Sequence, residues 1–178
     1  MIFPVLISLF VISSILTSCG DKGHQVQLEM RDSLIYLKGT DSLFTGTERA
    51  AVHDKTVIYD VVKGKKNGSF KILYADGNPQ ITGTMVDNSN EGKWSYYYPD
   101  SKIESAGLFK NNLPEGEWKW YFDSGKLKEV GGYVKGRRNG KWLQFDKSGN
   151  IVLQKYFKDG EEIKNPDEEK SSVKREGK

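Results

Sequence analysis

The stretch Gly116-Glu117-Trp118-Lys119-Trp120-Tyr121-Phe122 decides the fold, because its pattern recurs along the chain. Glycines stand 24 residues apart, and a large aromatic residue follows each of them two positions later. The glycines are Gly68, Gly92, Gly116 and Gly140, and the aromatic residues are Phe70, Trp94, Trp118 and Trp142. A fixed period over four copies identifies a repeat protein. An imperfect earlier copy at Phe44-Thr45-Gly46 brings the count to five.

Each repeat predicts a β-hairpin. In residues 93–98 the aromatic density is typical of a strand, with Trp94 and Tyr96 on one face and Tyr97 on the other. Pairs typical of two-residue turns follow in each copy: Asp76-Gly77, Asp100-Ser101, Ser124-Gly125 and Ser148-Gly149. Residues 111–116 and their equivalents are rich in Asn, Gly and Pro, so we expect loops between hairpins. The predicted fold class is all-β, an elongated antiparallel sheet of successive hairpins.

Two-residue turns would also fix the register of every hairpin. Counting inward places Phe70 opposite Gly83, Trp94 opposite Gly107 and Trp118 opposite Gly131. We expect each ring to lie over the glycine that it faces and to shield its backbone. The last copy has Lys155 opposite Trp142, which predicts an end repeat that tolerates solvent.

The pattern resembles a known repeat family. Gly-x-Trp-x-x-Tyr, a turn such as Asp76-Gly77, and links such as Gly64-Lys65-Lys66-Asn67-Gly68 are similar to the MORN repeat in its bacterial variant, found in antitoxin-like proteins of the YwqK family. The resemblance covers residues 34–163. It implies an elongated, twisted sheet that binds or assembles, and it implies no shared chemistry.

The N-terminal residues predict a targeting segment. Residues 2–16 are almost wholly apolar, but a bilayer-spanning helix needs about 20 such residues. Leu16-Thr17-Ser18-Cys19 resembles the lipobox of bacterial lipoproteins. That resemblance implies cleavage before Cys19 and acyl chains, such as palmitate, on this residue. No Lys or Arg precedes Lys22, so the usual basic start of a signal peptide is missing. Two alternatives stay open: a misassigned start codon, and an uncleaved membrane anchor in place of the signal peptide.

These observations divide the chain into four parts. They are a lipoprotein signal peptide (1–18), a tether (19–33), the repeat domain (34–163) and a charged tail expected to be disordered (164–178). In the enteric-type lipoproteins that this segment resembles, Asp after the lipidated Cys favours the inner membrane. Gly20 follows Cys19 here, so we expect a protein of the cell envelope anchored in the outer membrane, in a leaflet that stays open.

Composition argues against several function classes. The 27 Lys and Arg against 24 Asp and Glu leave a net charge of only +3, without the basic stripe that a nucleic-acid binder needs. Two His and one Cys are too few for a zinc site or for Cys–His catalysis. Glu91 and Glu115 occupy equivalent positions, whereas an acid and a base need different environments. We therefore expect no enzyme activity, no metal and no cofactor.

Other side chains admit a structural and a binding role. The four Trp residues are expected to form the core of a thin sheet, although an exposed platform is the alternative. Tyr97 and Tyr121, on the face opposite to the Trp rings, are candidates for binding, with cross-strand packing equally open; Trp120 is a further candidate. His53, Lys65-Lys66 and Arg137-Arg138 are expected at solvated surface positions, with contact to anionic lipid as the alternative for the basic pairs.

The function expected from the sequence is non-enzymatic. A cell-envelope lipoprotein would present its repeat surface to another protein, whose identity stays open, as does the oligomeric state. An antitoxin or immunity protein that neutralises a toxin is one alternative, and a module that binds wall glycan or lipid is another.

Overall fold

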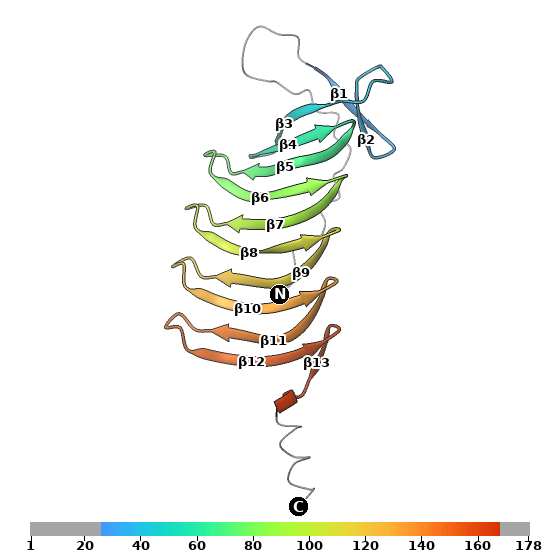
Figure 1. The fold of residues 1–178 in the computed structure, drawn as a ribbon. Coiled ribbons are helices and arrows are strands. Elements are labelled where there is room, and N and C mark those ends of the chain that lie inside the picture. Colours follow the sequence, from blue (N-terminus) through green and yellow to red (C-terminus); the bar gives the residue numbers. More distant parts are fainter. Residues whose placement is uncertain (1–25, 168–178) are drawn as a thin grey trace, which may run out of the picture.

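The computed structural model of the chain describes residues 26–167. Eleven antiparallel strands form one long sheet in which sequence neighbours are always spatial neighbours, and a separate two-stranded sheet lies near its first strands (Figure 1). The small sheet contains β1 (Leu28–Arg31) and β2 (Leu34–Leu37). The long sheet contains β3 (Gly46–Val52), β4 (Lys55–Val62), β5 (Lys65–Leu73), β6 (Pro79–Val86), β7 (Ser89–Tyr97), β8 (Ile103–Lys110), β9 (Leu113–Tyr121), β10 (Leu127–Val134), β11 (Arg137–Phe145), β12 (Ile151–Lys158) and β13 (Glu161–Ile163). The predicted fold class is confirmed.

Three-residue turns close four of the five hairpins. Between β7 and β8, the N–H of Ser101 donates to the carbonyl of Tyr98 at 2.9 Å, and the N–H of Tyr98 donates to the carbonyl of Lys102 at 2.8 Å. Ser101 has a φ of 64°, the left-handed conformation that ends such a turn. Equivalent bonds close the turns at 74–78, 122–126 and 146–150. The prediction of two-residue turns is therefore wrong by one residue.

A bulge directly after each of these turns restores the predicted register. In β8 the pairing shifts between Ile103 and Ser105, so Glu104 is an extra residue without a partner across the ladder. Beyond the bulge Trp94 lies opposite Gly107, as predicted. The same holds for Phe70 and Gly83, Trp118 and Gly131, and Trp142 and Lys155.

Two-residue turns join one hairpin to the next. Asn111 and Asn112 have φ values of 49° and 65°, and Lys110 pairs with Leu113 across them. Two consecutive positive φ values give the turn whose twist matches that of antiparallel strands. The prediction of a loop over 111–116 is wrong, because Leu113 already begins β9. The hairpins are thus parts of one continuous sheet.

The ring that covers each glycine comes from the following hairpin. A Cβ atom placed on Gly107 would overlap the indole of Trp118. The same relation joins Gly83 to Trp94 and Gly131 to Trp142. The prediction that Trp94 covers Gly107 is therefore wrong, although the two residues are register partners.

A second irregularity explains this difference. Between β8 and β9 the pairing jumps from Ala106 opposite Lys119 to Leu108 opposite Glu115, so Gly107 faces a longer piece of β9. Gly116 lies within that piece and has a φ of 65°, a conformation that glycine adopts without a steric cost. The extra backbone bends β9 and carries the Trp118 ring back over Gly107.

The indole nitrogens fix the rings in this position. The Nε1–H of Trp118 donates to the carbonyl of Leu108 at 3.0 Å, directly after the glycine that the ring covers. Trp94 donates in the same way to Thr84 at 3.1 Å, and Trp142 donates to Gly132 at 3.2 Å. Each of these three tryptophans therefore fills the space above a glycine and also provides a hydrogen-bond donor at an irregular point of the ladder.

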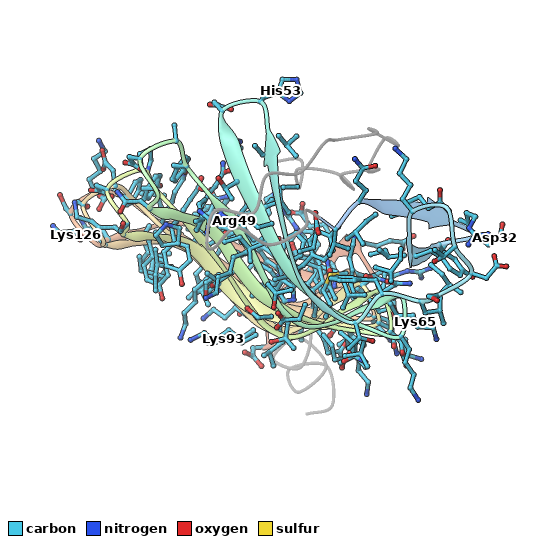
Figure 2. All side chains as sticks on the ribbon, turned by 90° about the horizontal axis from the view of Figure 1, so that it is seen from above. Asp32, Arg49, His53, Lys65, Lys93 and Lys126 are labelled. Carbon is cyan, nitrogen blue, oxygen red and sulfur yellow. The ribbon has the colours of Figure 1, made fainter. Side chains whose placement is uncertain are left out.

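The core lies on one face of this single layer. Trp94, Trp118 and Trp142 are 4%, 1% and 4% exposed. Phe109 and Tyr133 stand between them with edge-on ring contacts, with centroids 5.2 Å apart for Phe109 and Trp118 and 5.1 Å apart for Tyr133 and Trp142. Lys93, the strand neighbour of Trp94, projects from the convex side of the curved sheet (Figure 2), so the rings line its concave face.

Both ends of the array depart from the repeat. β1 lies within the predicted tether (19–33), so that segment is shorter than predicted. The N–H of Ile35 in β2 donates to the carbonyl of Gly64 at 2.8 Å and fastens the small sheet to a link turn. At the other end Lys164 and Pro166 stand 24 residues after Gly140 and Trp142, so no ring follows to cover Lys155. The signal peptide (1–18) and residues 168–178 of the tail lie outside the described residues.

Substitution of Gly107 tests the interlock. Gly107→Val forces a branched side chain into the ring of Trp118. This overpacking should reduce the free energy of unfolding by about 1 to 3 kcal/mol. Lys155→Val, at the equivalent position with no ring above it, should be neutral or stabilising because Val favours strands. Urea melts measure both variants, and a stabilised Gly107→Val would contradict the interlock.

Candidate binding surface

Two rows of side chains run across the concave face. The first row carries the interlocked rings described above, and it contains the predicted repeat residues. Together with the repeat glycines Gly68, Gly92, Gly116 and Gly140, these residues build the fold. Of the two roles considered for the tryptophans, the core role holds for Trp94, Trp118 and Trp142, because their rings are almost fully buried.

The second row changes character along the array. Its successive cross-strand partners are Val57, Ile72, Ile81, Tyr96, Ser105, Trp120, Glu129, Gln144 and Leu153. The first three are aliphatic and suffice to pack this part of the face. From β7 onward the row becomes aromatic and polar, although the strand geometry stays the same. We call the segment from Tyr96 to Gln144 the polar-aromatic row.

Trp120 is the large half-exposed ring of this row. Its centroid lies 6.0 Å from that of Trp118 and 5.6 Å from that of Trp142, with tilted ring planes. These contacts hold the indole in one orientation without burying it fully. A rigid, partly exposed Trp gives a partner a large contact area at a small cost in side-chain entropy.

Tyr96 and Glu129 flank Trp120 at different depths. Tyr96 is half-buried, and burial raises the pKa of its hydroxyl to about 12, so the ring is neutral at physiological pH. Glu129 is only 5% exposed and lines a hollow of about 20 Å³ together with Arg138, Gln144 and Lys155. A space of this size holds about one water molecule. The row therefore combines rigid aromatic surface with a charged, hydrogen-bonding depression.

Arg138 and Lys66 differ from the prediction of solvated loop residues. Both are strand residues at equivalent positions, 72 residues apart, and both are half-buried. The guanidinium carbon of Arg138 lies 4.3 Å from the ring centroid of Trp142, and the Nζ of Lys66 lies 5.0 Å from that of Tyr59. These cation–π contacts anchor the two side chains on the concave face. Their neighbours Lys65 and Arg137 are exposed, as predicted.

Tyr97 and Tyr121 are not brought together with Trp120. They alternate with Tyr96 and Trp120 along β7 and β9 and therefore lie on the convex face. Both are half-buried, and the hydroxyl of Tyr97 lies 3.2 Å from Oγ1 of Thr82. The three residues predicted as binding candidates thus belong to two separate surfaces.

Glu91 and Glu115 have structural partners. Oε2 of Glu91 accepts the backbone N–H of Asn111 at 2.9 Å, and Oε2 of Glu115 accepts that of Lys135 at 2.8 Å. Each carboxylate thus stabilises the link turn of the next hairpin, a repeated role that explains the repeated residue. His53 is exposed at the tip of the hairpin of β3 and β4 (Figure 2).

Several features concern membranes and metals. Cys19 lies outside the described residues. Between residues 26 and 167, no helix is long and apolar enough to cross a bilayer. The same residues contain no group of three or more His, Cys, Asp or Glu side chains arranged to hold a metal ion.

Three hairpin units of the chain match a model of a known repeat family. Residues 90–111, 114–135 and 138–159 match the family model described as MORN repeat variant. These segments run from β7 to β12 and contain the whole polar-aromatic row. These three segments are similar to MORN repeats, a likeness that suggests a repeat-based binding module. No curated protein matches the chain.

The polar-aromatic row could have been found by comparing repeat columns. Residues 72, 96, 120 and 144 are Ile, Tyr, Trp and Gln, and residues 81, 105, 129 and 153 are Ile, Ser, Glu and Leu. These columns vary in polarity while their neighbours keep Gly or a ring. Sequence reasoning identified Trp120 but missed Ser105, Glu129 and Gln144, because it followed the columns that stay constant.

A second buried carboxylate marks the start of the first row. Glu48 in β3 is 7% exposed, and its Oε1 has no hydrogen-bond partner within the described part of the chain. Burial raises the pKa of this carboxyl above its ordinary value of 4.5. Its cross-strand partner Tyr59 has a pKa raised to about 12, first by burial and then by the charge of Glu48.

The stability of the fold should depend on this carboxyl. Because the folded state holds the proton more tightly, Glu48 stabilises the fold below its ordinary pKa of 4.5, and this contribution is lost as the pH rises through the elevated folded value. Glu48→Gln should therefore raise the free energy of unfolding at pH 7 and change it less at pH 4. Urea melts at both pH values measure this, with Glu162→Gln, an exposed carboxylate, as the control. A Glu48→Gln variant less stable at pH 7 would contradict the assignment.

Proposed function

We propose that this protein is a non-enzymatic lipoprotein of the bacterial cell envelope that presents its polar-aromatic row to another protein. The observation that supports a binding role most directly is the half-exposed Trp120 between Tyr96 and the Glu129 hollow. Trp, Tyr and Arg are the residue types enriched at the energetic centres of protein interfaces.

A protein partner fits this surface better than a small molecule. The hollow that Glu129 and Gln144 of the row line measures about 20 Å³, whereas small-molecule pockets usually exceed about 300 Å³. A concave face about one repeat wide suits a helix or a loop laid across the strands. The aromatic side chains and the few charged groups of the row are typical of such an interface.

The anchor rests on the sequence pattern around Cys19. The residues before it are apolar over a length typical of a signal peptide, and two or three acyl chains would hold the protein stably at a membrane. Anchoring would leave the repeat domain in the aqueous phase of the envelope, with the outer membrane as the expected site.

Cys19→Ala tests the anchor. The variant should accumulate as an unprocessed precursor and take up no labelled fatty acid, whereas the parent protein should be labelled and should partition with membranes. Gel mobility and fatty-acid incorporation measure the two effects. Lipid incorporation that continues in the variant would refute the proposed lipoprotein.

Two neighbouring residues of β9 test which face binds. Trp120→Ala removes the ring from the concave face, and Tyr121→Ala removes a ring of similar size from the convex face. Partner capture by cross-linking in intact envelopes should fall at least about tenfold for Trp120→Ala, as expected for an interface hot spot, and should persist for Tyr121→Ala. Thermal melts of both variants confirm that each is folded at the assay temperature.

The opposite outcome would move the site. Loss of the partner in Tyr121→Ala alone would place the interface on the convex face. Gln144→Ala, a smaller change in the same row, serves as a second concave variant that leaves the ring contacts of Trp120 intact. Retention of the partner in all three variants would contradict a protein interface on the repeat domain.

A further inference from the structure

The long sheet has two open edges. β3 forms one end of the strand order, and β12 is covered by β13 only along Tyr156, Phe157 and Lys158 (Figure 1). The preceding residues of β12, from Ile151 to Lys155, face no strand within residues 26–167 on their outer side. Open backbone edges of this kind are templates for pairing with a further strand.

The open part of β12 is unusually apolar. Ile151, Val152 and Leu153 are 55%, 60% and 39% exposed. Edge strands are normally protected by charged side chains, by proline or by a covering segment. Here Lys164 and Pro166 occupy the Gly and Trp positions of the next repeat, so the chain does not continue the strand that would cover this edge.

We propose that β12 of one molecule pairs in antiparallel fashion with β3 of a second copy, with Lys155 opposite Glu48 and Ile151 opposite Val52. The contact uses different surfaces on the two molecules, so it joins copies end to end. It depends neither on the lipid anchor nor on the partner proposed above.

The rows of the concave face fix this register. Glu48 begins the first row and Lys155 ends it, while Ala50 begins the second row and Leu153 ends it. Joining each end to the matching beginning continues both rows without a break. A shift by one residue would turn the apolar side chains of one edge to the opposite face.

The charges at the joint are complementary. Glu48 has a buried carboxylate oxygen without a hydrogen-bond partner in the described residues, and Lys155 is the cation on the matching position. The Nζ of Lys155 lies 2.6 Å from Oε2 of Glu162, and Arg138 and Glu129 line the hollow beside it. Strand pairing would hold the carboxylate of Glu48 against the ammonium group of Lys155, which also contacts Glu162. An apolar contact between Leu153 and Ala50 would lie next to it.

The residue pattern of β3 also supports the pairing of β3 with β12. The return strands β4, β6, β8 and β10 are each followed by a strand that carries Gly-x-aromatic from its fourth residue onward. β3 begins with Gly46-Thr47-Glu48, the same pattern with Glu in the place of the ring. A ring would meet the side chain of Lys155, whereas a carboxylate can bind its ammonium group. β3 is thus the strand of this chain whose outer edge and residue pattern both suit β12.

Two end variants and their mixture test the contact. Val152→Lys should block the β12 end and Ala51→Lys the β3 end, because both positions are exposed and Lys on an edge opposes pairing. Sedimentation of the mature chain lacking acylation should show concentration-dependent species larger than a dimer. Each variant alone should associate at least about tenfold more weakly. An equimolar mixture of the two should form a heterodimer and stop there, since each molecule retains one working end.

A matched control and a charge variant sharpen the result. Val134→Lys replaces an exposed apolar residue within the array and should leave association unchanged. Glu48→Gln should weaken association although it stabilises the isolated fold at pH 7, so the two effects have opposite signs. A monomer at all concentrations would overturn the proposal. So would association that Val152→Lys abolishes and Ala51→Lys leaves intact, since that pattern indicates two β12 edges in contact.

Discussion

The contact between each tryptophan and the glycine of the preceding hairpin is the interaction on which the rest of the structure depends. A single-layer sheet has no second layer to bury its apolar face, so the rings have to cover one another and the backbone beneath them. Trp118 reaches 1% exposure because it lies flat over Gly107, between Phe109 and Tyr133. The bulge at Gly116 provides the bend, and the indole N–H bonds the carbonyl of Leu108. Ring, bulge and hydrogen bond therefore act as one unit.

This unit leaves other positions free to vary. Once the first row is fixed, the second row can change from Ile72 and Ile81 to Trp120 and Glu129 without disturbing the sheet. Binding modules built from repeats use the same separation, in which constant positions hold the scaffold and variable positions meet the partner. The polar-aromatic row is confined to the segment from β7 to β11, where the interlock is repeated most regularly.

The sequence predicted the strands and the inner register because those depend on local patterns. Asp100-Ser101 marked a turn, and alternation in residues 93–98 marked a strand. The sequence did not predict that Trp118, rather than Trp94, covers Gly107, because both choices obey the period of 24 and only the backbone geometry at Gly116 separates them. The sequence did not predict the burial of Glu129 and Ser105 for a related reason. Burial of a polar side chain depends on neighbours two strands away, which the order of residues along one strand does not encode.

The interlock also has a direction along the chain. Each glycine is covered by a tryptophan that comes 11 residues later, as for Gly83 and Trp94 or Gly107 and Trp118. A ribosome makes the chain from its N-terminus, so Gly83, Gly107 and Gly131 each leave the exit tunnel before the ring that covers them. A partly synthesised array therefore exposes the glycine backbone of its newest hairpin until the next hairpin is made. Lys155, at the equivalent position, has Pro166 rather than a tryptophan 11 residues later.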